Sequence, residues 1–538
     1  MDTTDLTLIV FGPLVLGLGL LFMRHDDRKG LYEWAFGVSI APFLYSLTLL
    51  RTFDPAGNTF QLLTPERFRA WIDVENVVKI EYLLGVDGIS MLLILLTTII
   101  TPLSILTTMR RPKANYRQFL LAILALETCV LGCMCALDLF LFLFFWTVSI
   151  VPVFFITGVW GTGRKINSGI KFMIFSLIGC IALSASIFTL QSLSADGTFS
   201  IVKLMNDENI QRLGIEGQSW LFWGFMIAFA IRMPIVPLHT WLPDLDHDSP
   251  TTGTILINVL MLTLGSYGIV RICIPFFPEA VPAYSPLLMT LGVICIIYGA
   301  WIASIQRDLR RLIAYTSISH AGFIVLGLLS LSRNGMTGAV LHIVNLGICI
   351  GGLTIIAGFL LERRGSLKID DFGGLIKVTP QLGTMYRIVT FALIGLPGLS
   401  LFTSMFLILT GLFESENYIH GILAATGLIW FAVLMLNAFR RIMLGKITQP
   451  AIEKVKDLDT REFWILAVIV LMILYMGLFS PPLTGRIAPG IERTCFRINT
   501  YNPFSISEEY YFTERAFNPS DEFRAVMEGI GDGGAGNE

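Results

Sequence analysis

Charged residues are scarce in this sequence. Only 14% of its 538 residues are Asp, Glu, Lys or Arg, whereas 54% are hydrophobic and the mean hydropathy is +0.71. Soluble domains carry charge on about a quarter of their residues, because their surface must be largely polar. The composition therefore excludes a soluble globular protein and predicts an all-α polytopic membrane protein whose surroundings are the lipid bilayer. The net charge of −2 gives no reason to expect a nucleic-acid partner.

The sequence also lacks the motifs of soluble cofactor and metal sites. None of its eight cysteines forms a Cys-x-x-Cys pair, and seven lie in or beside apolar runs, where cysteine behaves as a small hydrophobe. There is neither a phosphate-binding glycine loop nor a dinucleotide-binding fingerprint. We therefore expect no cofactor and no metal in this chain, so any oxidoreductase activity must reside in partner subunits.

Long apolar runs are what the sequence has instead. A membrane-spanning helix needs about 20 predominantly apolar residues. Roughly fourteen runs fit: 5–23, 31–50, 88–108, 118–135, 139–158, 169–192, 219–238, 252–274, 286–305, 311–331, 335–361, 384–413, 418–443 and 463–483. The first run lacks a basic start and a small-residue cleavage pattern, so it is expected to stay as a helix and not to be removed as a signal peptide.

The loop charges predict the orientation of these helices. Every second loop is basic, with representative residues Arg28, Arg117, Arg164, Arg307, Arg363 and Arg440. Cytoplasmic loops carry an excess of Lys and Arg, which places these loops in the cytoplasm and both termini on the periplasmic or intermembrane side. The exception is the loop expected after the seventh run, which carries Asp244, Asp246 and Asp248.

Two of the runs contain helix breakers. Pro234 and Pro237 follow Arg232 in the seventh run, and Gly395-Leu396-Pro397-Gly398 interrupts the twelfth. Broken helices in corresponding halves of a membrane protein indicate inverted repeats around a path at mid-membrane. The interval between the breaks predicts two inverted five-helix repeats. The predicted organisation is three N-terminal helices in 1–117, repeats in 118–274 and 286–443, a cytoplasmic loop and last helix in 444–483, and a polar tail in 484–538.

Few ionisable residues lie inside the predicted spans. They are Glu127, Arg232, His320 and His342, with His239 close to a helix end. Such residues are expensive in hydrocarbon and commonly mark ion or proton paths, so we take these five as the candidate proton path. The alternative for the histidines and Glu127 is a buried side chain satisfied by hydrogen bonds. Asp138 is expected only to cap the helix that follows it.

Several motifs resemble one family when taken together. They are GVDGISMLLILLTTIITPLSIL (85–106), ALDLFLFLFFW (136–146), IKFMIFSLIG (170–179), AFAIRMPIVPLHTWLPD (228–244), RDLRRLIAYTSISHAG (307–322), ERRGSLKIDDFGGL (362–375), GLPG (395–398) and DLDTRE (457–462). This set is similar to the M-type antiporter-like subunit of respiratory complex I, the chain called NADH dehydrogenase subunit 4 in mitochondria. The resemblance implies an antiporter-like fold, a bacterial or mitochondrial inner membrane, and L-type and N-type antiporter-like chains as membrane-arm partners.

The sequence departs from that family at charged positions. The resemblance implies a glutamate where Thr147 stands, a lysine at Arg232, a lysine at Thr263 and an acid at Met405. Arginine is effectively always protonated, and neither threonine nor methionine titrates usefully. His320 matches the family, and His342 lies one turn before the place of the family's other histidine.

These departures leave three readings. In the first, the chain is a membrane-arm subunit of an NADH:quinone oxidoreductase whose own proton path is altered or inactive. In the second, it belongs to a cation/proton antiporter or a proton-driven inorganic-carbon uptake complex. In the third, it translocates protons by a route through Glu127, His320, His342 and water.

Overall fold

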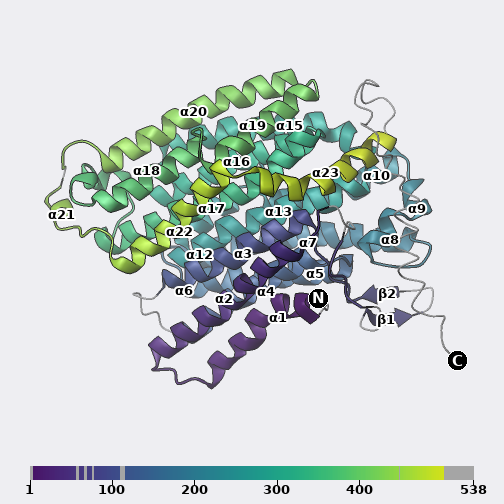
Figure 1. The fold of residues 1–538 in the computed structure, drawn as a ribbon, viewed down its shortest axis with the longest axis horizontal. Coiled ribbons are helices and arrows are strands. Elements are labelled where there is room, and N and C mark those ends of the chain that lie inside the picture. Colours follow the sequence, from purple (N-terminus) through teal and green to yellow (C-terminus); the bar gives the residue numbers. More distant parts are fainter. Residues whose placement is uncertain are drawn as a thin grey trace.

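The computed structural model describes residues 4–55, 60–65, 69–74, 78–108, 115–447 and 449–501. In these parts of the chain nearly every residue belongs to a helix, and the helices pack side by side as one bundle (Figure 1). The basic residues Arg110, Arg111 and Lys113 and the aromatic residues beyond Tyr501 lie outside the described residues.

Fourteen membrane passages can be traced through the described residues. The first seven are α1 (Thr4–Gly17) with η1 (Leu18–Phe22), α2 (Arg28–Thr52), α3 (Gly88–Leu106), α4 (Tyr116–Cys135), α5 (Leu139–Val148) with α6 (Ile150–Trp160), α7 (Lys165–Leu193), and α10 (Ile215–Arg232) with α11 (Trp241–Asp248). The eighth is continuous through α12 (Thr251–Leu256), η3 (Ile257–Met261), α13 (Leu262–Gly268), η4 (Ile269–Cys273) and α14 (Ile274–Phe276). The last six are α15 (Ala280–Ile305), α16 (Leu309–Leu329), α17 (Arg333–Arg364), α18 (Pro380–Ile394) with α19 (Ser400–Glu414), α20 (Tyr418–Met443) and α22 (Thr460–Leu478).

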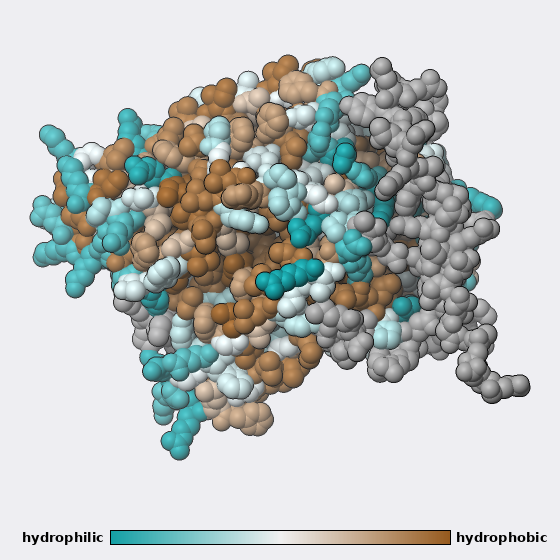
Figure 2. Space-filling model, viewed as in Figure 1, coloured by the Kyte–Doolittle hydropathy of each residue, from teal (hydrophilic) through white to brown (hydrophobic). Residues whose placement is uncertain are grey.

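The predicted helical membrane fold is confirmed. Eleven described passages are long and apolar enough to cross a membrane as single helices. The remaining three are built from shorter pieces, since α1 continues as a 3₁₀ helix and the seventh and twelfth passages are broken. Figure 2 shows hydrophobic side chains over much of the middle of the visible face and hydrophilic ones gathered at its left edge.

Both predicted helix breaks are present and occupy equivalent places. Passages four to eight and nine to thirteen each form a set of five, and the break falls in the fourth passage of each set. Because five is an odd number, the second set must enter the membrane from the side opposite to the first. The helix order therefore agrees with two five-helix sets of opposite orientation, and the repeats themselves stay a prediction.

One sequence prediction about the seventh passage is wrong. The span was expected to end near residue 238, with the three acids in a loop, but the chain resumes as α11 after the break. Asp246 is fully buried and Asp248 nearly so. The break makes this passage longer than an unbroken helix, so Asp246 and Asp248 fall inside the bundle, whereas the side chain of Asp244 is 41% exposed.

The centre of the bundle is α17. Its 18-residue apolar window is completely buried, as is that of the eighth passage, whereas only 39% of the corresponding window of α7 is buried. A helix that is apolar all round belongs in the interior of a large bundle. The site described below is therefore built on the most buried helices.

Small extramembrane elements were not predicted from the sequence. Strands β1 (Ala70–Val74) and β2 (Val78–Glu81) form an antiparallel hairpin, and helices α8 (Ile201–Met205) and α9 (Glu208–Gln211) lie at the same end of the bundle (Figure 1). Asp138 caps α5 as expected, accepting hydrogen bonds from the backbone of Phe140 and Leu141. Its other oxygen accepts from the Glu81 backbone N–H, which joins the hairpin to the bundle. The opposite end carries η5 (Ile369–Asp371), η6 (Leu375–Lys377) and α21 (Pro450–Glu453).

The expected polar tail begins with a further helix, α23 (Pro481–Tyr501). Leu483, Ile487, Ile491 and Ile498 are buried on one face of it, at the spacing of an amphipathic helix. The Arg486 carbonyl lies so close to Gly88 that any side chain at Gly88 would collide with it. This helix therefore packs on the bundle, with α3, α14 and α17 as neighbours, although its mixed composition concealed it in the sequence.

Candidate functional site

The first break runs from Met233 to Thr240, between α10 and α11. Prolines leave backbone carbonyls without their helical partners, and these must be satisfied by other groups. Here the Trp241 indole N–H donates to the Ile231 carbonyl at 2.9 Å, and the Ile235 N–H donates to the Ala230 carbonyl at 3.0 Å. The break is thus a fixed turn whose freed carbonyls have partners.

Arg232 ends α10 and is 1% exposed. Its guanidinium donates to the Trp146 carbonyl at 3.2 Å and to the Met261 sulfur at 2.7 Å. The same group lies over the rings of Trp146 and Phe172, 4.8 and 5.6 Å from their centroids. No acidic side chain in the described part of the chain forms an ion pair with it. Aromatic faces, one carbonyl and one sulfur therefore hold this buried cation.

Thr147 follows the residue whose carbonyl Arg232 binds. It is exposed at the surface of the bundle, and its hydroxyl contacts the Cys180 sulfur at 3.7 Å. The resemblance implied a glutamate here. The backbone of Thr147 adjoins the carbonyl that Arg232 binds, and the Thr147 hydroxyl carries no charge that could pair with that cation.

Thr263 lies between two π-helical turns, η3 and η4, in the eighth passage. A π turn leaves a local carbonyl without its usual partner, and the Thr263 hydroxyl donates to the Val259 carbonyl at 2.6 Å. The side chain is fully buried. The resemblance implied a lysine at this position. The chain instead has a hydroxyl that is hydrogen-bonded to a backbone carbonyl of the same helix.

The second break runs from Gly395 to Leu399. Gly395 and Gly398 have φ values of +80° and +88°, a backbone region that side-chain-bearing residues rarely adopt. The Asn345 amide donates to the Ser400 carbonyl at 2.7 Å, which ties α17 to the start of α19. Met405 is buried beneath this turn, and its sulfur lies 2.8 Å from where a Cβ of Gly395 would be. A methionine therefore fills the place where the resemblance implied an acid.

The structure brings His320 and His342 together. The Nδ1 of His320 lies 3.2 Å from the Nε2 of His342, and the Nδ1 of His342 lies 3.0 Å from the Ser404 hydroxyl. Both rings are buried, and His320 packs edge-on against Phe431 with centroids 4.7 Å apart. A short polar chain thus links α16 and α17 to the second half of the broken twelfth passage.

The other two candidates stand apart from this pair. Glu127 on α4 is fully buried, and neither carboxyl oxygen has a hydrogen-bond partner among the described residues. His239 lies in the first break between Tyr298 and Tyr315, with ring centroids 5.2 and 6.4 Å away. No contact recorded in the described part of the chain joins Glu127 to Arg232 or to the histidines.

A buried acid that the sequence analysis placed in a loop belongs to a further polar chain. Asn258 donates to the Asp246 carboxylate at 2.6 Å, and the Ser317 hydroxyl donates to the Asn258 side-chain oxygen at 3.2 Å. Ser317 lies on α16, one turn before His320. Hydrogen bonds join Asp246 through Asn258 to Ser317, and a second polar chain begins one turn later and runs from His320 through His342 to Ser404. No hydrogen bond among the described residues joins Ser317 to His320. If the helical spacing of apolar residues had been followed beyond Pro237, Asp246 could have been recognised as a buried acid.

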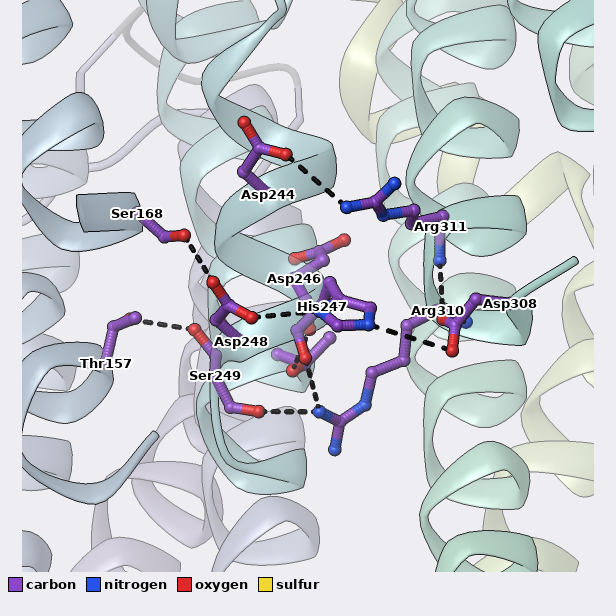
Figure 3. Close-up of polar contacts among 11 residues, drawn as sticks. Thr157, Ser168, Asp244, Asp246, His247, Asp248, Ser249, Asp308, Arg310 and Arg311 are labelled. Carbon is purple, nitrogen blue, oxygen red and sulfur yellow. Dashed lines mark hydrogen bonds and ion pairs between the residues drawn. The ribbon is translucent and has the colours of Figure 1, made fainter. Parts of the chain in front are cut away.

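An ionic cluster surrounds the start of the first of these chains (Figure 3). Asp248 accepts from the Ser168 hydroxyl at 2.5 Å and lies 2.9 Å from the His247 ring. Arg310 donates to the carbonyls of His247 and Ser249 at 3.0 and 2.8 Å. Figure 3 shows these side chains lying between α11 and the start of α16, so charged and titratable groups from two passages meet there.

One buried ion pair was missed altogether. Arg271, in η4, lies 2.5 Å from the Asp87 carboxylate, and both side chains are less than 10% exposed. The Arg271 guanidinium also donates to the Tyr267 hydroxyl at 3.2 Å. Arg271 lies inside the predicted run 252–274 but was not among the ionisable residues named for the spans.

Comparison with known proteins identifies the family. Residues 136–430 match the family described as NADH:quinone oxidoreductase/Mrp antiporter, and residues 68–133 match the amino terminus of NADH-ubiquinone oxidoreductase chain 4. The NADH-quinone oxidoreductase subunit M of Rickettsia prowazekii is 32% identical over 483 residues, which cover 89% of this chain and 96% of the relative. The chain belongs to the subunit M family of NADH-quinone oxidoreductase.

Solved structures agree with this placement in the subunit M family. A chain in respiratory complex I from Thermus thermophilus has a TM-score of 0.82 and 29% identity, over 92% of this chain and 99% of that one. A chain of the Mrp complex from a Dietzia species has a TM-score of 0.78 and 17% identity, over 93% of this chain and 98% of that one. The second likeness shows only the fold, which is that of an antiporter-like membrane subunit.

Proposed function

We propose that this subunit M family member is a membrane-arm subunit of a proton-translocating NADH:quinone oxidoreductase, and that its own proton path is altered. The supporting observation is the environment of Arg232, a permanent cation held by rings, a carbonyl and a sulfur. A group that carries protons must both gain and lose them, and arginine does not readily lose one. Arg232 therefore anchors the first break and does not relay protons.

Thr263 and Met405, two further positions where the resemblance implied a charged residue, support the same conclusion. The hydroxyl of Thr263 is occupied by the Val259 carbonyl, and Met405 fills the second break with an apolar side chain. Neither side chain titrates near neutral pH. In the proposed complex, the chain would add mass and contact surface next to L-type and N-type antiporter-like chains, with the redox chemistry carried out by other subunits.

A rerouted path is the second candidate, favoured by the two polar chains between Asp246 and Ser404. The first begins at the ionic cluster of Figure 3, and the second reaches the second break through His320 and His342. An imidazole ring has one nitrogen that donates and one that accepts a hydrogen bond, so a proton can be passed through it, and water can join the remaining gaps. This route contains neither Arg232 nor any of the altered positions.

Two variants separate the candidates in the native complex. With the inactive path, Glu127→Gln and His342→Gln both leave the ratio of protons moved to electrons transferred unchanged. A lower ratio from His342→Gln alone would favour the rerouted line, and a lower ratio from Glu127→Gln would mean that α4 carries protons. Electron-transfer rate and complex content, measured on the same membranes, control for loss of assembly.

The partners and the orientation have separate tests. NADH-oxidising subunits and the two other antiporter-like chains should co-purify with this chain. Recovery with antiporter or inorganic-carbon uptake proteins in their place would reject the complex I assignment. Reporter fusions should place the Arg307 loop in the cytoplasm or matrix and both termini on the opposite side, as the basic loops indicate.

A further inference from the structure

The His247 ring lies between two carboxylates that belong to different membrane passages. Its Nδ1 is 2.9 Å from the Asp248 carboxylate on α11, and its Nε2 is 3.9 Å from the Asp308 carboxylate at the start of α16 (Figure 3). The His247 side chain is 41% exposed, whereas those of Asp248 and Asp308 are 8% and 23% exposed. The ring therefore spans the two passages and can still exchange protons with water.

The hydrogen bonds that this ring can form depend on its charge. A neutral imidazole has one nitrogen that donates and one that accepts, whereas a protonated imidazole donates from both nitrogens, and an ionised carboxylate only accepts. A neutral His247 can therefore donate to Asp248 or to Asp308, and its other nitrogen then presents a lone pair to the remaining carboxylate. Only the protonated ring can bind both acids.

Both carboxylates are held in place by other groups. The second oxygen of Asp248 accepts from the Ser168 hydroxyl on α7 at 2.5 Å. The second oxygen of Asp308 accepts from two backbone N–H groups in the first turn of α16, at 2.9 and 3.3 Å, and so caps that helix. Each acid is therefore fixed by one oxygen and leaves the other oxygen for His247.

The other charged groups near the ring have partners of their own. Lys171 on α7 pairs with Asp244 at 2.7 Å, and Arg311 on α16 lies 3.9 Å from the same carboxylate. Arg310 donates to two backbone carbonyls at the end of α11, and Asp246 accepts from a buried amide of the eighth passage. The further basic residues bordering this cluster are Arg164, Lys165, Arg307 and Lys368.

Helix α11 is the segment that the ring would hold. It has only eight residues, follows the first break directly and carries the buried Asp246. Its start is fixed to α7, because Lys171 donates to the Thr240 carbonyl at 2.7 Å. Its end meets α16 through the Arg310 guanidinium, which keeps its charge at every ordinary pH, and through His247. Of these two contacts with α16, only that of His247 can change with protonation.

We propose that His247 is a pH-dependent clamp that fastens the end of α11 to the start of α16. Imidazole is the ordinary side chain that changes charge between about pH 5 and 8. When protonated, the ring bridges Asp248 and Asp308. When neutral, it loses its bond to one of these acids, and Arg310 alone holds the end of α11 against α16. The clamp therefore strengthens as the pH falls and weakens as it rises, whether or not this chain carries protons.

Hydrogen exchange of α11 in the purified complex tests the clamp. The backbone amides of residues 241–249 are followed by mass spectrometry at about pH 6 and about pH 8, and each rate is divided by the intrinsic rate at that pH. We expect the corrected rate to be about fivefold lower at the acidic value, the upper end for one partly exposed ion pair. His247→Gln should abolish this difference, because its amide stays neutral at both values.

Two further variants separate charge from other effects. His247→Arg carries a permanent charge, so it should give slow exchange of α11 at both pH values. Asp308→Asn keeps an oxygen that can cap α16 but removes the second negative charge. It should abolish the pH difference in α11 without faster exchange in the first turn of α16.

His420→Gln is the matched control, because His420 is a partly exposed histidine on α20 that contacts the Thr290 hydroxyl, far from α11 in the chain. It should leave the pH response of α11 unchanged. The proposal is overturned if wild-type α11 has the same corrected rate at both pH values, a comparison that needs no variant to fold. It is also overturned if His247→Gln keeps the wild-type response, if His420→Gln loses it, or if His247→Arg exchanges as fast as His247→Gln.

Discussion

The ion pair between Asp87 and Arg271 should be one of the most sensitive points of the structure. Arg271→Met removes the cation and keeps much of the side-chain volume. The Asp87 carboxylate, which is only 2–3% exposed, is then left buried without its partner charge. Breaking a buried pair by removing one partner costs about 3–5 kcal/mol, because the remaining charge is uncompensated. Methionine also loses the hydrogen bond to the Tyr267 hydroxyl.

A second variant separates the charge from the local hydrogen bonds. Asp87 also caps α3, since the same side chain accepts from the Ser90 N–H at 2.8 Å. Asp87→Asn keeps an oxygen for that bond while removing the negative charge. The double variant, Asp87→Asn with Arg271→Met, should therefore recover much of the stability lost in Arg271→Met, since no unpaired buried charge remains.

These effects are measured by thermal unfolding of the purified complex. Unfolding of this chain is detected as the loss of its resistance to proteolysis. The four proteins of the double-mutant cycle are compared in the same detergent. A loss below about 1 kcal/mol from Arg271→Met, or a double variant no more stable than that single one, would refute the reasoning. In that case the pair would be accessible to water and would contribute like a surface ion pair.

Two further predictions concern the first break. Gly265→Val should prevent normal packing, because a Cβ there would lie 2.5 Å from the Met233 backbone nitrogen. We expect a lower content of this subunit in membranes. Gly214→Ala is the control and should leave the content unchanged, because no atom lies near a Cβ at that position. Trp241→Phe keeps an aromatic side chain, although a smaller one, and leaves the Ile231 carbonyl without its indole donor. It should cost about 1–3 kcal/mol in thermal unfolding, and an unchanged melting temperature would mean that water replaces the indole.

Much of the architecture could be predicted because the bilayer restricts the possible structures. Backbone groups in hydrocarbon must bond within their own helix, so apolar length alone located the passages, and the prolines and glycines at 234, 237, 395 and 398 located both breaks. The seventh passage was misjudged beyond Pro237, since a local reading cannot tell a helix that ends from one that resumes. Helix α23 was missed because only a narrow face of it is apolar.

The site was predictable in its members but not in its connections. Residues such as Arg232, His320 and His342 were selected because an ionisable group in an apolar run is rare, and all three are buried. That His320 contacts His342, or that Glu127 has no hydrogen-bond partner among the described residues, depends on the rotation and packing of separate helices. Asp246 was placed in a loop because the seventh span was expected to end near residue 238, and Arg271 was overlooked although it lies inside a predicted run; the partners of both come from other segments of the chain.

The sequence by itself determined that this chain is a multi-pass helical membrane protein, and which of its helices break. Hydrophobic length and helix-breaking residues act locally, so they can be read one segment at a time. Only the tertiary structure decided which buried charges meet and that Asp246 lies inside the bundle. Those contacts join residues distant in the chain, and the close packing that creates them leaves no signature in any single segment.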